Sequence, residues 1–295
     1  MAALSSSKLT GAALQVIGHG GPESIAADPA AKIKFDSCMH PMLIRCKSTN
    51  KRKKMPLLNY YSQTKMAKGE KFGYKTAILH LAPYDLSGKN VCPKATKGPG
   101  GCIAPCLNTS GRGQMGSVQQ ARINKTNLFW SNKNAFLWQL STEIEQLKKR
   151  AASQGYKFAV RLNGTSDLPW HRMKVDGGGS LMQLHPDVQF YDYTKVLNYL
   201  DHDLKNYHIT FSDSGKNQAD QIAAMEKGAN VAVVFQDKLP KRWRISHGSS
   251  CNDRRVIDGD KHDLRFKDPS GVVVGLVAKG LGRKVTKNSF IKIAS

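Results

Sequence analysis

Long apolar runs and acidic side chains are both scarce in this sequence. No apolar segment of the 295 residues approaches the roughly 20 that a membrane-spanning helix needs, which argues against a transmembrane protein. The first 31 residues are rich in Ala, Ser and Gly and lack the compact apolar stretch of a signal peptide. We therefore expect a cytoplasmic location and no membrane partner.

The shortage of acidic residues makes the chain strongly basic. Lys and Arg number 45 against 22 Asp and Glu, a formal net charge of +23, which is typical of proteins that bind a polyanion. Nucleic acid is the first expected partner. The candidate contacts lie in two segments: Lys51, Arg52, Lys53 and Lys54, and then Lys241, Arg242 and Arg244. Trp243 could stack on a base or pack locally, and a solvated basic surface is the plain alternative for both segments.

Short apolar runs alternate with helical or loop segments along most of the chain. Six runs predict buried strands: Thr76–Leu81, Lys157–Leu162, Val188–Tyr191, His208–Phe211, Asn230–Phe235 and Val272–Val277. Four segments predict helices: Gln119–Trp130, Asn134–Gln154, Tyr193–Leu204 and Lys216–Lys227. Strands that alternate with helices indicate a parallel sheet.

The predicted fold class is therefore α/β. We expect a partial or full β/α (TIM-like) barrel of about six or more parallel strands, in preference to a doubly wound sheet. Residues 1–31 are interpreted as a flexible N-terminal arm and residues 32–295 as a single β/α domain.

Polar side chains follow the predicted strands at the positions where β/α proteins bind ligands. We expect a pocket there. Its predicted cofactor-binding residues are Arg161, Asn163 and Thr165, and its predicted catalytic residues are Asp167, Asp192 and Asp213.

Three of the six cysteines fall in one glycine-rich loop that begins ten residues after the first predicted strand. Cys92, Cys102 and Cys106 are the predicted metal ligands, because the intervening glycines let the backbone fold back and bring three sulfurs together. Three thiolates suffice for an iron-sulfur cluster with one open iron. Zinc is the alternative and needs a fourth ligand, for which the candidates are Cys251, Cys46, His40 and His80. Three unrelated thiols are the plain alternative.

The segment Asp258–Phe266 holds three carboxylates and a histidine in six positions. It could bind a divalent ion for phosphodiester chemistry. A polar turn in which Asp258 and Asp260 accept hydrogen bonds from the local backbone is the favoured interpretation.

Four segments resemble those of a phage-encoded family, the gene product eighty-eight type. They are Cys92–Gly98, Gly101–Arg112, Arg161–Asp167 and Asp258–Phe266. The resemblance implies a phage or prophage protein that acts in a bacterial host.

The order strand, cysteine loop, helix, strand is similar to the architecture of radical S-adenosylmethionine enzymes. In those enzymes three thiolates hold a four-iron four-sulfur cluster whose open iron chelates S-adenosylmethionine. Here only Cys102 and Cys106 keep the three-residue gap of that superfamily. The resemblance implies an iron-sulfur, S-adenosylmethionine-dependent enzyme acting on nucleic acid or a nucleotide. The alternative is a zinc-braced, basic nucleic-acid-binding or nuclease-like protein.

Overall fold

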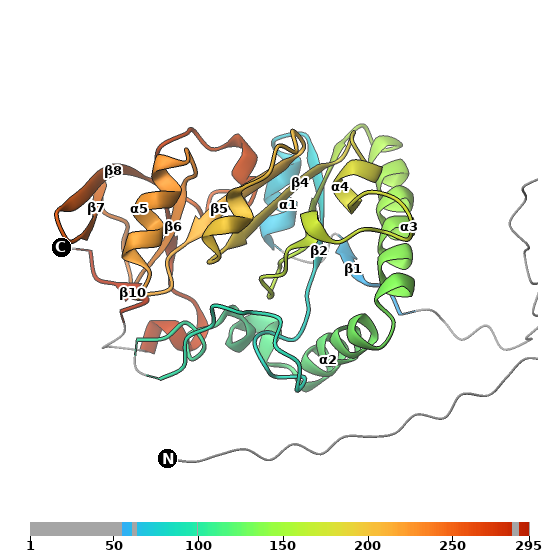
Figure 1. The fold of residues 1–295 in the computed structure, drawn as a ribbon, viewed down its shortest axis with the longest axis horizontal. Helices are drawn as coiled ribbons and strands as arrows, with labels where there is room; N and C mark the ends of the chain where they lie inside the picture. The colour runs from blue at the N-terminus through green and yellow to red at the C-terminus, as the bar shows by residue number, and fades with distance from the viewer. Residues whose placement is uncertain (1–54, 61–63, 99, 285–288, 295) are drawn as a thin grey trace, which may run out of the picture. The chain divides into compact units, whose positions relative to one another are not determined.

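The computed structural model of the protein describes residues 55–60, 64–98, 100–284 and 289–294 (Figure 1). The predicted N-terminal arm, the basic run Lys51–Lys54 and the candidate zinc ligands His40 and Cys46 lie outside these residues, as part of the segment 1–54, and so does Cys38. Cys38 has no predicted role.

One sheet of ten strands organises the described residues. Its strands are β1 (Leu58–Tyr60), β2 (Tyr74–Leu79), β3 (Lys157–Arg161), β4 (Gln189–Thr194), β5 (Tyr207–Ser212), β6 (Val231–Phe235), β7 (Arg242–His247), β8 (Ser250–Asp258), β9 (Val273–Val277) and β10 (Ile291–Lys292). All six strands that the sequence predicts are present, as β2 to β6 and β9. Their apolar runs are continuous because strands of a parallel sheet are covered on both faces.

The sheet is mostly parallel. Its order is β1-β2-β3-β4-β5-β6-β9-β8-β7, with β10 beside β6. β1 is antiparallel to β2 and β7 is antiparallel to β8, whereas every other pairing is parallel. The predicted α/β class with a parallel sheet is confirmed.

A closed barrel is not formed by the described strands. The strand order rises from β1 to β6 without the reversal of a doubly wound sheet, so the winding follows one direction as in a barrel. The path nevertheless ends at β7, which does not pair with β1. The physical reason is the chain after β6, which enters an exposed antiparallel hairpin, β7 and β8, where a barrel would continue with a helix and another parallel strand.

In the part of the chain that the structure describes, five α-helices connect the strands: α1 (Thr64–Glu70), α2 (Gly116–Ser131), α3 (Lys133–Ala152), α4 (Leu181–Leu184) and α5 (Gln218–Glu226). Six 3₁₀ turns join them: Leu107–Thr109, Gly111–Gln114, Trp170–Arg172, Leu197–Leu200, Arg265–Lys267 and Gly280–Lys284. α2, α3 and α5 confirm three predicted helices. The fourth, Tyr193–Leu204, is wrong, because its first residues extend β4, pairing Thr194 with Phe211 of β5. Aromatic and β-branched residues favour that extended backbone.

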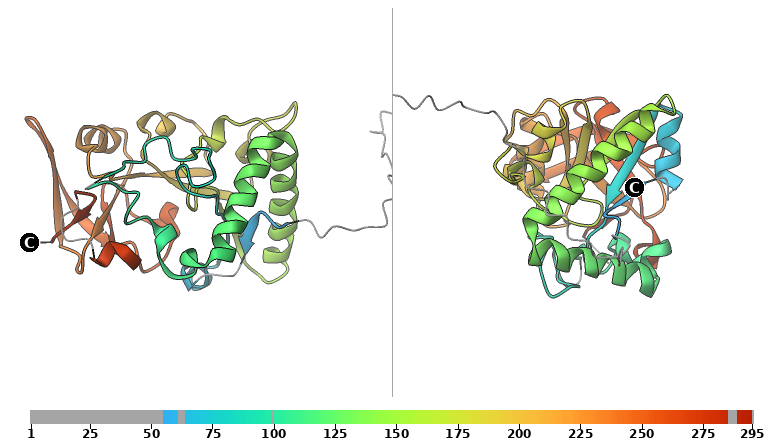
Figure 2. Two further views of the ribbon diagram at one scale, coloured as in Figure 1. Left: turned by 90° about the horizontal axis from the view of Figure 1, so that it is seen from below. Right: turned by 90° about the vertical axis from the view of Figure 1, so that its right-hand side faces the viewer.

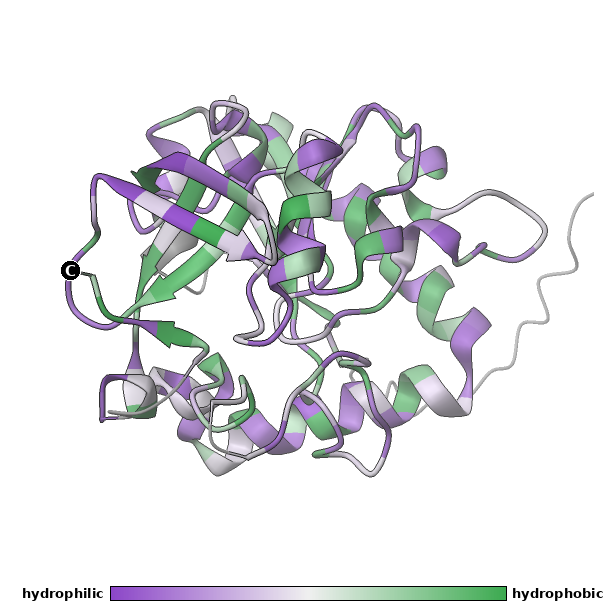
Figure 3. Cartoon of the chain, turned by 60° about the vertical axis from the view of Figure 1, so that its left-hand side comes forward, coloured by the Kyte–Doolittle hydropathy of each residue, from purple (hydrophilic) through white to green (hydrophobic). Residues whose placement is uncertain are grey.

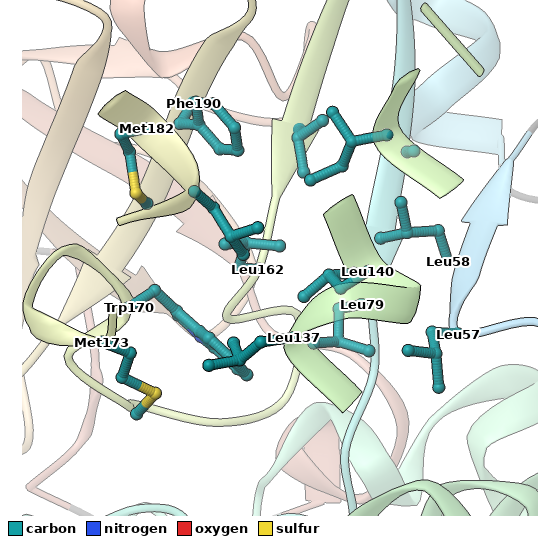
Figure 4. Packing of buried hydrophobic residues seen from close by; sticks show 14 of the residues in the cluster. Leu57, Leu58, Leu79, Leu137, Leu140, Leu162, Trp170, Met173, Met182 and Phe190 are labelled. Carbon is teal, nitrogen blue, oxygen red and sulfur yellow. The ribbon is translucent and has the colours of Figure 1, made fainter. Parts of the chain in front are cut away.

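The apolar core lies between the sheet and the helices that pack on it. α3 contacts β1, β2 and β3, whereas α5 contacts β5 to β8, toward opposite ends of the sheet in Figure 1. Leu137 and Leu140 of α3 pack among Leu79, Leu162 and Trp170 (Figure 4), and all five side chains are fully buried. Among the described residues, no helix has both the length and the apolar character to cross a membrane.

Candidate functional site

The three loop cysteines line one cavity of about 220 Å³. Part of the remaining wall comes from residues that follow β3, β4 and β9, among them Asp167, Lys195 and Lys279. These residues stand at the carboxyl ends of parallel strands, where β/α proteins bind their ligands. The cysteine segment and α2 lie below the sheet in the view of Figure 1 and in the right-hand view of Figure 2.

Local hydrogen bonds fix the course of the cysteine loop. The amide of Cys102 donates to Thr96 Oγ1 at 3.0 Å, and the amide of Ile103 donates to the carbonyl of Thr96 at 3.3 Å. Gly101 permits this close approach, because a Cβ there would stand 2.2 Å from the Thr96 carbonyl oxygen. Gly100 adopts a φ of 82°, which favours glycine. The glycines therefore do fold the loop back, as the sequence predicts.

Burial controls the protonation of two of the thiols. It raises the pKa of Cys92 to about 12, with smaller opposing effects from the Tyr84 amide and Lys195. It also raises the pKa of Cys106, again opposed by a backbone amide and by Lys195. The Tyr84 amide donates to Cys92 Sγ at 3.3 Å. Both thiols are therefore protonated at neutral pH, and a bound metal would have to displace their protons.

The sulfurs share a cavity without being gathered round one point. Among the described residues, no group of three or more His, Cys, Asp or Glu side chains is arranged to hold a metal ion. Cys251 is exposed on β8 and does not line the cavity. His80 lines a neighbouring cavity, where burial lowers its pKa to about 3. The chemistry of a three-thiol donor set suits an iron-sulfur cluster or zinc, and either would require the loop to adjust.

All three predicted cofactor-binding residues line the cysteine cavity. Two of their polar groups are already used within the protein. Asn163 Oδ1 accepts hydrogen bonds from Ser166, from the Leu168 amide and from Trp170 Nε1, and Thr165 Oγ1 donates to the carbonyl of Leu81. Asn163 therefore shapes the turn after β3.

Arg161 is held by a carboxylate and an aromatic ring. Its Nη1 lies 3.1 Å from Asp263 Oδ2, and its guanidinium group lies 4.5 Å from the centre of the Tyr193 ring. Asp263 also accepts a hydrogen bond from the Tyr191 hydroxyl at 3.2 Å. Asp263 also lines the cavity, although it is not among the predicted site residues. The sequence feature that could have identified it is its place in the acidic segment Asp258–Phe266.

The three predicted catalytic carboxylates occupy different positions. Asp167 lines the cavity, where it accepts hydrogen bonds from Thr194 Oγ1 and from the Lys195 amide, and burial raises its pKa. Asp192 and Asp213 do not line it.

Asp192 accepts hydrogen bonds from the Asn163 amide and the Tyr207 hydroxyl, and burial raises its pKa to about 7. Asp213 Oδ1 accepts from the Gly215 amide, and its Oδ2 lies 3.0 Å from Lys292 Nζ. Asp192 therefore links β4 to β5 and to the turn after β3, and Asp213 links the turn after β5 to β10.

A second cavity, of about 730 Å³, shares part of its wall with the first, including Arg161, Thr165 and Lys279. Arg122 and Lys125 of α2 line it, and so does Arg112. The sequence reasoning missed these three residues. The sequence does not mark them, because the apolar residues of the predicted helix form no stripe from which its inward face could be identified.

The basic segment Lys241–Arg244 lies at and beside the start of β7, at the open edge of the sheet (Figure 3). Lys241, Arg242 and Arg244 are exposed, and Arg242 pairs with Asp253 at 3.0 Å. Trp243 packs edge-on against Phe235 at 5.0 Å, so its local interpretation is confirmed.

The predicted acidic turn is present. Asp258 Oδ1 accepts a hydrogen bond from the Asp260 amide at 2.8 Å, and Asp260 in turn pairs with Lys279 at 2.7 Å. The favoured interpretation of this segment as a polar turn is confirmed for Asp258, whereas the Asp260 carboxylate accepts a hydrogen bond from the Val277 amide of β9.

The family described as Gene product 88 matches residues 52–292, which is most of the chain. No curated protein and no solved structure matches significantly.

Proposed function

We propose that this chain, which belongs to the Gene product 88 family, is an iron-sulfur enzyme that uses S-adenosylmethionine to modify a nucleotide or nucleic acid. Cys92, Cys102 and Cys106 would hold the cluster. The observation that carries the proposal is that all three thiols line one cavity at the carboxyl ends of the parallel strands.

The cavity walls support a negatively charged metal centre. Lys195 acts on both Cys92 and Cys106 in the direction that favours their thiolates. The Tyr84 amide points at Cys92 Sγ, and hydrogen bonds of this kind tune the potential of iron-sulfur clusters. Cys106 also feels the positive charge of Arg122. Thiolates at Cys92 and Cys106 would therefore be compensated by cations and backbone donors.

The donor count favours a cluster over zinc. Structural zinc takes four protein ligands, and the described residues bring three cysteines to the cavity. A cluster bound through three cysteines supplies an iron free of protein ligands, which can chelate S-adenosylmethionine. The exposed cations of β7 and the net charge of +23 support a polyanionic substrate.

Anaerobic purification followed by iron, sulfide and zinc analysis tests the proposal. We expect a brown protein with about four irons per chain, the content of a four-iron cluster. The Cys102→Ala variant should lose the colour and most of the iron. The matched control is Cys251→Ala, which removes the exposed cysteine outside the cavity and should leave the iron content unchanged. A colourless protein with one tightly bound zinc per chain would overturn the proposal.

A further inference from the structure

Helix α2 turns a polar, basic face toward the protein. Its buried side chains are Arg122, Lys125, Thr126 and Phe129. Val118, Ala121, Arg122 and Lys125, which follow the helical spacing i, i+3, i+4 and i+7, line the 730 Å³ cavity. One helical face therefore presents two cations to this cavity.

These cations are buried without a carboxylate partner. Arg122 is 8% exposed and Lys125 is 6% exposed. Within the part of the chain that the structure describes, no carboxylate lies within 4.0 Å of either charged group. Arg122 Nη1 donates to Asn108 Oδ1, but its buried Nε has no hydrogen-bond partner. Buried charges cost free energy unless they are paired, so an anion bound at this face would reduce that cost.

Lys125 is likewise a buried cation with few partners for its charged group. Its Nζ donates to the carbonyl of Leu57 at 2.7 Å, which satisfies one of three donors. Burial lowers its pKa to about 8, and Glu143 offsets only part of this effect. A bound anion would supply the missing counter-charge.

Other donors converge on the same space. Arg112, which is exposed, lines the cavity, and so do Ser117 and Val118 at the amino end of α2. The amino end of a helix of this length carries a partial positive charge, and no side chain caps it here. Arg161 and Lys279 add two further cations, each already paired with an aspartate.

We propose that this cavity binds the phosphate group of a nucleotide, with Arg122, Lys125 and Arg112 as its charged ligands. Its volume of about 730 Å³ leaves room for more than a phosphate, and Ile78, Leu107 and Val118 supply apolar wall for the rest of the molecule. The shared wall would bring the ligand next to the cysteines. Calling this ligand a substrate rests on the proposed function, but its binding does not.

Calorimetry tests the phosphate site with adenosine 5′-monophosphate and adenosine as probes. We expect adenosine to bind at least about tenfold more weakly, because charged hydrogen bonds to the phosphate are lost. Arg112→Glu should weaken binding of the monophosphate by about tenfold or more. The matched control is Lys174→Glu, an exposed cation that lines neither cavity and should leave the affinity unchanged.

Arg122→Gln should abolish binding, with circular dichroism as the check that the variant folds. If it does not fold, Arg112→Glu decides the question, because its side chain is exposed. Equal affinities for the monophosphate and adenosine, or no binding of either, would overturn the inference. So would equal affinities of Arg112→Glu and Lys174→Glu.

A 5′-phosphorylated single-stranded oligonucleotide identifies the source of the phosphate. Tighter binding than the monophosphate assigns the site to the end of a nucleic acid, and weaker binding assigns it to a free nucleotide; both support the phosphate site. All titrations are repeated after treatment with a chelator. A protein without a cluster that still binds the monophosphate would remove the proposed function and leave this inference standing.

Discussion

Helices α2 and α3 follow one another with only Asn132 between them, yet they bury opposite kinds of surface. The fully buried side chains of α3 include Phe136, Leu137, Leu140 and Ile144. The buried side chains of α2 are Arg122, Lys125, Thr126 and Phe129. The two helices therefore contribute to the protein in different ways.

We interpret the inward face of α3 as a packing face and the inward face of α2 as a binding face. Burial of apolar surface drives folding, and the inward face of α3 supplies such surface to the main core. Buried cations without counter-charges oppose folding. An anionic ligand in the cavity beside α2 would supply the counter-charge for the cations on this face.

The largest effect should come from shortening a side chain of the packing face. Leu140→Ala removes a fully buried side chain from the core, and we expect a loss of about 2–5 kcal/mol in the free energy of unfolding. Urea denaturation measures it. The folded fraction should still bind adenosine monophosphate with unchanged affinity, because Leu140 lines neither cavity. A loss below 1 kcal/mol would mean that α3 is not packed as described.

The next largest effect is a pH dependence of the free energy of unfolding that arises from Lys125 on the binding face. The pKa of Lys125 is lowered from 10.5 to about 8 in the folded protein, so between these values the unfolded chain binds more protons. The contribution of Lys125 to the free energy of unfolding should therefore rise with pH through this window. Buried thiols such as Cys92, whose pKa is raised, contribute in the opposite direction, so the effect of Lys125 is read as the difference between the unmodified protein and Lys125→Met. The total rise from this group is at most about 3 kcal/mol, from about 1.4 kcal/mol per pKa unit. Lys125→Met should lose this rise and also lose nucleotide binding.

Urea denaturation at several pH values between 7 and 10.5 measures this dependence. The matched control is Lys149→Met, which removes an exposed lysine of α3 and should keep the rise. At pH 7 Lys125→Met should change stability less than Leu140→Ala, because it removes a buried charge together with a hydrogen bond. If the free energy of unfolding of Lys125→Met rose as steeply with pH as that of the unmodified protein, Lys125 would not titrate in this window.

The strands of this fold could be predicted from the sequence because their apolar runs are short, continuous and bounded by turn residues. β6 reads Val-Ala-Val-Val-Phe and lies between β5 and β9, where no solvated face interrupts the pattern. The hairpin of β7 and β8 could not be predicted in this way. Its residues are largely exposed and polar, and the alternation is limited to Trp243 and Ile245 of β7, which is too short a pattern to predict a strand. That hairpin ends the sheet where the sequence predicts a barrel.

The cavity itself could be predicted in part. Cys92, Cys102 and Cys106 stand out because few cysteines occur elsewhere, and the residues after β3 follow a recognisable strand. Arg122 and Lys125 could not be singled out in a chain with 45 Lys and Arg residues. Only the tertiary structure distinguishes the cations on the inward face of α2 from those in solvent.

The smallest expected effect distinguishes two kinds of residue on the inward face of α2, those that stabilise the fold and those that bind the ligand. Thr126 is fully buried but lines neither cavity, and its Oγ1 accepts a hydrogen bond from the Ala82 amide at 2.9 Å. Thr126→Val keeps the shape of the side chain and leaves that buried amide without its partner. We expect a loss of about 1–3 kcal/mol in the free energy of unfolding and no change in nucleotide affinity.

Thr126→Ser is the matched control, because it keeps the hydroxyl group and loses only a methyl group. It should retain more stability than Thr126→Val in the same urea experiment. If Thr126→Val weakened binding of the monophosphate as strongly as Arg112→Glu, the inward face of α2 would act as one unit. Unchanged binding, together with reduced stability, would show that Thr126 ties α2 to the end of β2 while the neighbouring Arg122 and Lys125 are left to hold the ligand.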